Sequence, residues 1–225
     1  MKKLAIYGDS FSSTQPIFDL DDSNLSKIGP PWPLLLSNYS VTNFSYPGTD
    51  LYYSYKHFLD NYTQFDQNIF VITSINRISI KYNNEWINII SNPRKHPKKN
   101  KVTTILTNYL TVQDLERERL FKKLILNDIK SKDKNVYIID AFDDIDGLRL
   151  ITKMENVCWG FDYLNMPKTT YDLRYCHMTD RNNEILAKQI TADLDNKVTK
   201  FKLNIDTFYK PNKNDKDIYI VNYTP

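Results

Sequence analysis

Two residues far apart in the chain are of the types that perform nucleophilic catalysis. Ser10 comes shortly after the apolar run 4–7, and His177 stands near the other end of the chain. A serine hydroxyl is a poor nucleophile at neutral pH unless a base within hydrogen-bond reach takes its proton. Histidine is a suitable base, and Asp172 precedes His177 closely enough to orient its ring. These residue types predict nucleophilic catalysis at Ser10.

Other residues of reactive type are expected to be inert. Of the three histidines, His57 falls within a predicted helix and His96 within the basic loop 93–101, so both are expected at the surface. Cys176 is the neighbour of His177, and adjacent side chains of an extended loop point in opposite directions. Cys176 is therefore predicted to be a buried or unreactive thiol.

The elements that must position Ser10 and His177 alternate along the chain. Apolar runs with turn residues at their ends predict strands at 4–7, 39–44, 68–73 and 135–140. Helical spacing of apolar residues predicts helices at 30–36, 51–62 and 111–130, and a last helix capped by Thr179. This alternation predicts a three-layer α/β/α domain with a mostly parallel sheet. The loops that follow its strands would gather at one edge, which brings Ser10 and His177 together.

The length of the chain favours one domain. We expect it to span residues 1–198, with insertions near 78–110 and 143–175 where no clean period is present. Residues 199–225 are expected to form a C-terminal extension. Its apolar stretch 218–221 suits an edge strand or a surface that docks on a partner.

Composition excludes several classes of partner. A formal net charge of +3, with Lys and Arg spread along the chain, gives no basic face for a nucleic acid. No apolar run approaches a membrane span, and the residues before Asp9 are too few for a secretory leader, so a cytoplasmic location is expected. Two cysteines are too few for a disulfide framework or a metal quartet. We expect no metal, no cofactor, no nucleic acid and no membrane as partners.

Four separated segments resemble the blocks of the SGNH, or GDSL, hydrolases, in that family's order. Gly8-Asp9-Ser10 matches the first block, and Gly48 closes a segment like the second. The third block keeps its asparagine, Asn76, and His177 stands where the last block has its histidine. The resemblance implies a flavodoxin-like fold with Ser10 as nucleophile and His177 as base. It also implies an oxyanion hole formed by the Ser10 amide, the Gly48 amide and the Asn76 side chain.

The chain departs from the family pattern at two blocks. The third block lacks its glycine and aspartate, and Arg77 follows Asn76. The Arg77 cation could hold an anionic group of a substrate or pair with a carboxylate such as Asp9. In the last block, the position three before His177 is Arg174, and the acid stands two residues earlier at Asp172.

Several ways of orienting His177 therefore stay open. Asp172 could reach the histidine if its loop bulges, Asp162 could replace it, or a backbone carbonyl could serve in a Ser-His dyad. In each of these arrangements, no residue of the site is expected to bind a metal ion.

The resemblance implies an esterase that removes an O-acetyl or other short acyl group from a small molecule or a glycan. The alternative is a binding or structural module that keeps this fold with weak or no catalysis. The chain also resembles the compact stand-alone members of this family in bacteriophages. A viral origin would make the protein virion-associated. The sequence leaves the oligomeric state open.

Overall fold

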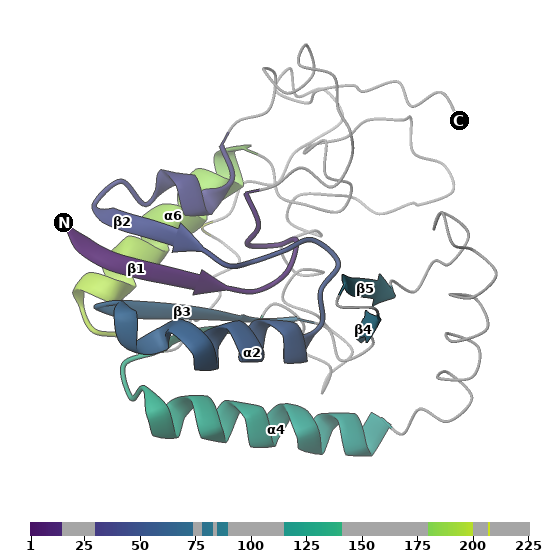
Figure 1. Ribbon diagram of the computed structural model, residues 1–225. Coiled ribbons are helices and arrows are strands. Elements are labelled where there is room, and N and C mark those ends of the chain that lie inside the picture. Colours follow the sequence, from purple (N-terminus) through teal and green to yellow (C-terminus); the bar gives the residue numbers. More distant parts are fainter. Residues whose placement is uncertain are drawn as a thin grey trace, which may run out of the picture.

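The computed structural model describes residues 1–14, 30–73, 78–82, 85–89, 115–140, 180–199 and 207. A parallel four-stranded sheet forms their centre, with the order β2-β1-β3-β6 (Figure 1). Its strands are β1 (Lys2–Tyr7), β2 (Tyr39–Asn43), β3 (Gln67–Ile72) and β6 (Tyr137–Asp140). The helical elements are η1 (Trp32–Leu35), α2 (Leu51–Asn61), η2 (Tyr62–Gln64), α4 (Leu115–Lys132) and α6 (Asp180–Asp195).

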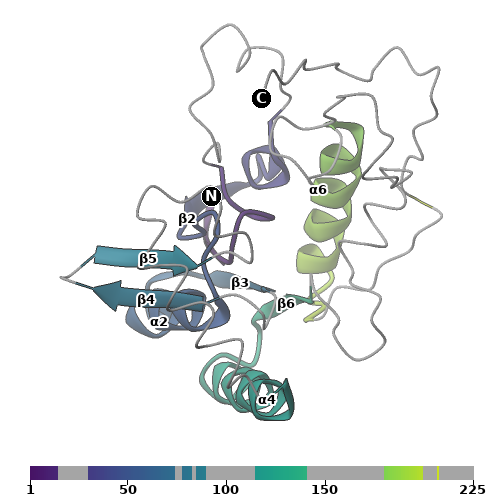
Figure 2. The ribbon, with the colours of Figure 1, turned by 90° about the vertical axis from the view of Figure 1, so that its right-hand side faces the viewer.

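Helices cover both faces of the sheet, as Figure 2 shows. Alternate residues of β1 face opposite sides, so Leu4 and Ile6 pack with η1 and α6, while Ala5 and Tyr7 pack with α2 and α4. All four of these side chains are fully buried. An apolar strand without a polar face is what a parallel sheet covered on both sides requires. The predicted three-layer α/β/α architecture with flavodoxin-like strand order is confirmed.

The strand order creates a switch point at β1. The chain passes from β1 to β2 on one side and then crosses to β3 on the other. The connections that leave β1 and β3 therefore diverge, and in open α/β sheets ligands bind at such a point, outside the carboxyl ends of the strands. Ser10 follows β1 at this edge.

The expectation that 78–110 lacks regular structure is wrong for its first part. Strands β4 (Ile78–Tyr82) and β5 (Glu85–Ile89) pair antiparallel, and Figure 1 shows them beyond the carboxyl ends of β1 and β3. The signal was present in the sequence, because Ile78, Ile80 and Tyr82 alternate with polar residues. The short connection between the strands completes a hairpin pattern.

Other predictions concern residues outside the described part of the chain. They are the start of α4 near Thr111, the cap at Thr179, the second insertion 143–175 and nearly all of the extension 199–225. One contact of the extension is described, since the Ile138 amide donates a hydrogen bond to the Thr199 carbonyl oxygen at 3.0 Å. The chain therefore returns to β6 after α6. None of the described helices combines the length and apolar character needed to cross a bilayer.

Tyrosine hydroxyls tie the helices to their neighbours. On α6, Asp195 accepts a hydrogen bond from Tyr39 of β2 at 3.1 Å, and Asp193 accepts one from Tyr137 of β6. On the other face, Tyr55 of α2 donates to Asp128 of α4 at 2.6 Å. Hydrogen bonds to a charged acceptor are stronger than neutral ones, so these contacts fix how the helices lie on the sheet.

Truncation of α4 on its inner face should destabilise the fold far more than truncation on its outer face. Ile129 is fully buried, so Ile129→Ala should lower the free energy of unfolding by about 2–5 kcal/mol. Leu124 on the same helix is 57% exposed, and Leu124→Ala should change it by less than about 0.5 kcal/mol. Urea denaturation of both variants measures the difference. Equal losses would contradict the assigned orientation of α4.

The tyrosine contacts predict a loss of stability in alkali. Burial, with the hydrogen bond to Asp195, raises the pKa of Tyr39 to about 12, above the value of 10.0 for an exposed tyrosine. Because the folded pKa is the higher, this stabilisation is complete below about pH 10 and is lost as the pH rises through about 12. Tyr39→Phe should flatten the decline in unfolding free energy over that range, measured by urea denaturation. The control Leu124→Ala, at a 57% exposed residue that does not titrate, should leave the decline unchanged.

Candidate active site

The turn that follows β1 holds Ser10 close to the sheet. Ser10 is 5% exposed. The Ser12 amide donates to the Asp9 carbonyl oxygen at 3.1 Å, and the Phe11 amide donates to Asp9 Oδ1, also at 3.1 Å. Asp9 thus accepts two hydrogen bonds within the turn, one on its side chain and one on its carbonyl oxygen. These two bonds fix the backbone on both sides of Ser10.

Asp9 also joins the Ser10 turn to the end of β3. Its carboxylate is fully buried, and Oδ2 accepts a hydrogen bond from Thr73 Oγ1 at 3.1 Å. Thr73 is itself fully buried and directly follows β3. A buried carboxylate is costly unless it is hydrogen-bonded, so the Thr73 hydroxyl meets part of that requirement. The turn is therefore positioned by two neighbouring strands.

Gly8 makes this close packing possible. A Cβ atom at Gly8 would lie 2.2 Å from Ser12 Oγ and 2.8 Å from Val71 Cβ. The Ser12 hydroxyl could rotate away, but Val71 is a fully buried residue of β3 with a branched Cβ, and it has no such freedom. Glycine therefore allows the chain to leave β1 directly against β3.

The segment after β2 continues alongside the Ser10 turn. The Phe44 amide donates to the Ile6 carbonyl oxygen at 2.8 Å, and the Tyr46 amide donates to that of Gly8 at 3.2 Å. Side chains add two more bonds, from Ser12 Oγ to Ser45 Oγ at 2.9 Å and from Asn43 Nδ2 to the Ser12 carbonyl oxygen at 2.7 Å. The loop after β2 is thereby fastened to the residues on both sides of Ser10.

Gly48 lies in this second loop and has a positive φ of 79°. That conformation is costly for residues with a Cβ, which explains a glycine at the position. Thr49 fixes the turn, since Thr49 Oγ1 lies 2.7 Å from the Tyr46 carbonyl oxygen and 3.3 Å from that of Gly8. Asp50 then caps α2 by accepting a hydrogen bond from the Tyr53 amide at 2.8 Å. The structure thus brings the Gly48 loop and the Ser10 turn together.

The carboxyl edge of the sheet is polar and buried as a result. Six hydroxyl side chains of the Ser10 turn and the adjoining loops are at most 6% exposed: Ser10, Ser12, Ser13, Ser45, Thr49 and Thr73. No group of three or more His, Cys, Asp or Glu side chains suited to a metal ion occurs among the described residues. At this edge, hydrogen bonds between the loops replace the apolar contacts of the core.

Trp32 of η1 connects the Ser10 turn to α6. Its indole Nε1 donates to the Phe11 carbonyl oxygen at 3.0 Å, and its backbone amide donates to Asn183 Oδ1 at 2.9 Å. Trp32 is fully buried, and Asn183 is 2% exposed in the first turn of α6. Trp32 therefore connects the first turn of α6 to Phe11, the residue that follows Ser10.

Sequence reasoning missed Trp32, Thr73 and Ser45 as residues that position the site. Trp32 follows two prolines in an apolar run, which indicates a buried short helix but no contact with Ser10. Thr73 directly follows an apolar strand, and a polar residue at such a strand end was the available signal.

Several predicted site residues lie outside the described part of the chain. They are His177, Asp172 and Asp162, together with Asn76 and Arg77. Among the predicted residues, the structure describes Ser10 and Gly48 and joins their loops by hydrogen bonds.

The prediction that His57 is a surface residue is wrong. The side chain is half-buried on α2, and its ring lies 4.5 Å from that of Tyr53 and 6.0 Å from that of Phe44, between centroids. Burial lowers the pKa of His57, and the Lys56 charge lowers it further against the opposing effect of Asp60. His57 is thus part of an aromatic cluster whose burial disfavours the charged form of its ring.

Together these features define a three-layer α/β/α protein with a serine turn at the switch point of its sheet. No protein-family model matches the chain, and no curated protein matches it. Among solved structures, it is similar to the crystal structure of the lipase/acylhydrolase from Enterococcus faecalis. The identity is 9% and the TM-score 0.39, over 90% of this chain and 100% of that one.

Removal of the Thr73 hydroxyl should destabilise the Ser10 turn. Thr73→Val keeps the shape of the side chain and removes the donor to Asp9 Oδ2, so the free energy of unfolding should fall by about 1–3 kcal/mol. Thr73→Ser keeps the donor and serves as the matched control. Urea denaturation compares the two variants. A Val variant as stable as the Ser variant would show that Asp9 does not depend on this bond.

Proposed function

We propose that the protein is a serine hydrolase that cleaves a carboxylic ester with a short acyl group, and that Ser10 is its nucleophile. The observation that carries this proposal is the position of Ser10. It lies in a turn fixed by Asp9 at the switch point of a parallel sheet, where such folds bind their ligands. A nucleophile held by hydrogen-bonded backbone needs little rearrangement to react.

His177 is the proposed base. It precedes Asp180, the first residue of α6, by three positions, and three residues of chain span at most about 10 Å. The first turn of α6 is linked to the Ser10 turn through Trp32. This short tether supports a role for His177 at the same edge of the sheet. Asp172, Asp162 or a backbone carbonyl would accept the hydrogen bond from its other ring nitrogen.

The proposed reaction has two steps. Ser10 Oγ attacks the ester carbonyl while His177 takes the hydroxyl proton, and the proton then passes to the departing alcohol as the acyl group stays on Ser10. Water repeats the attack with His177 as base, which releases the acid and restores Ser10. The Ser10 and Gly48 amides and the Asn76 side chain would donate to the oxyanion, while Arg77 would hold an anionic group of the substrate or pair with Asp9.

A binding or structural module with the same fold is the second candidate. The observation that favours it is the altered pair of sequence blocks, with Arg174 at the usual position of the acid and Arg77 after Asn76. Loss of the acid lowers the rate of a serine triad by orders of magnitude without removing the pocket. A virion-associated role would suit this candidate, and a cytoplasmic location suits either one.

Reaction with a fluorophosphonate probe separates the two functions. An activated serine attacks the phosphorus atom and keeps the label, so the wild-type protein should be labelled and should hydrolyse 4-nitrophenyl acetate. Ser10→Ala and His177→Ala should each abolish labelling and lower the hydrolysis rate by at least about 10³-fold. Ser13→Ala, at a buried serine of the same turn, is the control and should still be labelled. Label that persists in Ser10→Ala would refute the assignment of the nucleophile.

A further inference from the structure

Trp32 is held in one orientation by its neighbours. It begins η1 between Pro31 and Pro33, whose rings restrict the backbone and which have no amide hydrogen. The first amides of a helix have no partner within it, so the Trp32 amide needs an acceptor elsewhere. Asn183 supplies one through its side-chain oxygen at 2.9 Å. The indole also packs in one apolar cluster with Leu186 of α6, so reorientation of Trp32 would disturb that helix.

The indole of Trp32 constrains one peptide group of the Ser10 turn. Its Nε1 donates to the Phe11 carbonyl oxygen at 3.0 Å. That carbonyl and the Ser12 amide belong to the same planar peptide group, and the Ser12 amide donates to the Asp9 carbonyl oxygen at 3.1 Å. The two hydrogen bonds therefore orient this peptide plane from opposite sides, directly after Ser10.

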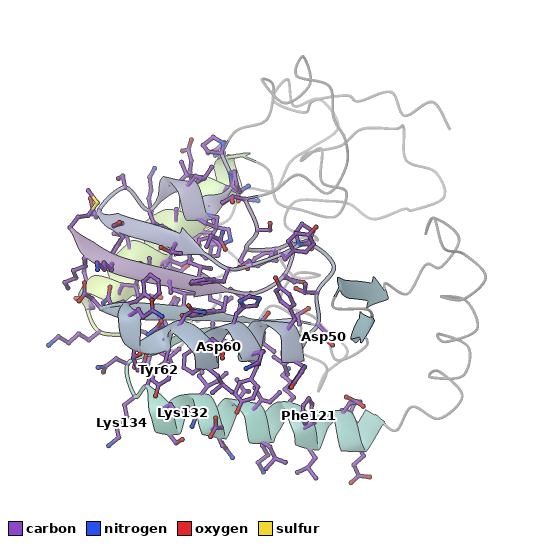
Figure 3. The ribbon with its side chains drawn as sticks, viewed as in Figure 1. Asp50, Asp60, Tyr62, Phe121, Lys132 and Lys134 are labelled. Atoms are coloured by element: carbon purple, nitrogen blue, oxygen red, sulfur yellow. The ribbon has the colours of Figure 1, made fainter. Side chains whose placement is uncertain are left out.

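Helices α2 and α6 both begin at the carboxyl edge, on opposite faces of the sheet. α2 begins beside the Gly48 loop, and Figure 3 shows Asp50 at this end of the helix. α6 begins near Trp32 and ends near the first residue of β2, where Asp195 accepts the hydrogen bond from Tyr39 at 3.1 Å. A buried donor therefore holds each end of α6, and the one at the carboxyl edge, Trp32, also contacts the Ser10 turn.

We propose that Trp32 is a positioning residue for the reaction at Ser10, because it transmits the placement of α6 to the serine turn. This inference rests on the proposed function, in which Ser10 is the nucleophile and His177, three positions before α6, is the base. Proton transfer requires the two groups at hydrogen-bond distance, and a small displacement lowers the rate by a large factor. Bonds from Trp32 to the serine turn and to the helix that follows the base limit such a displacement. Trp32 acts through the Phe11 peptide group and has no contact with the reacting atoms in this role.

A positioning role predicts a loss of turnover without a loss of substrate binding. Trp32→Phe keeps an aromatic ring and removes the indole donor, so kcat for 4-nitrophenyl acetate should fall by about tenfold while KM stays unchanged. Tyr39→Phe is the matched control, because it removes a side-chain donor from the other end of α6, and it should leave kcat unchanged. Rates are compared under conditions in which urea denaturation shows each variant to be folded. A kcat for Trp32→Phe equal to that of the wild type would overturn the inference and leave the esterase assignment intact.

A double-mutant cycle tests whether α6 acts through the indole. Asn183→Ala removes the acceptor of the Trp32 amide and should lower kcat by about threefold to tenfold. Asn183→Asp keeps an oxygen acceptor in the first turn of the helix and should retain the wild-type kcat. In Trp32→Phe protein, Asn183→Ala should cause no further loss, because the connection to Phe11 is already broken. Losses that multiply in the double variant would show two independent effects and would overturn the inference.

Hydrogen exchange keeps the inference testable if the wild-type protein hydrolyses no ester. In that case the proposed enzymatic function fails, and NMR of amide exchange examines the coupling alone. The Phe44 amide, which is bonded to β1, is the internal reference for a general loss of stability. Trp32→Phe and Asn183→Ala should each lower the protection of the Ser12 amide by about tenfold relative to Phe44, which would support the same coupling in a binding module. Tyr39→Phe should leave this ratio unchanged. A ratio that is also unchanged in the other two variants would overturn the inference.

Discussion

The site depends on the close approach of two strands at Gly8. Because that residue has no side chain, the chain leaves β1 against Val71 of β3, and a Cβ atom there would lie 2.8 Å from Val71 Cβ. The same proximity lets Asp9 accept a hydrogen bond from Thr73. The turn that carries Ser10 is thus shaped by the packing of the sheet, and its geometry does not rely on the loop alone.

The loops after β1 and β2 and the helices next to them also help to position the carboxyl edge of the sheet. The two loops after β1 and β2 share hydrogen bonds through Ser12 and Ser45, and α2 begins where the second loop ends. At the opposite end of the strands, tyrosine hydroxyls fix α6 through its terminal aspartates. Polar contacts therefore fix both ends of the sheet, while two clusters of apolar side chains fill the layers between the sheet and its helices.

Periodicity predicted the layers of the fold, because a buried parallel strand and an amphipathic helix each have a local signature. Ser10 was singled out for the same reason, because it stands in turn residues directly after an apolar strand, whereas Gly48 was singled out by the resemblance of its segment to a family block. Trp32 and Thr73 were not, since their roles are contacts between residues distant in the chain, and no local pattern specifies which partner a donor meets. The hairpin β4–β5 also has a local signature, because apolar and polar residues alternate along β4.

The bridge made by Trp32 has a consequence for the order of folding. Its two partners belong to the first and the last described parts of the chain, and Trp32 and Asn183 are separated by 151 positions. Contacts of such long range form slowly, because the intervening chain must first be ordered. A growing chain that has not yet added α6 can form the strands of the sheet but not this bridge. The Ser10 turn therefore gains its connection to α6 only after that helix has been synthesised, although Trp32 and Phe11 are made early.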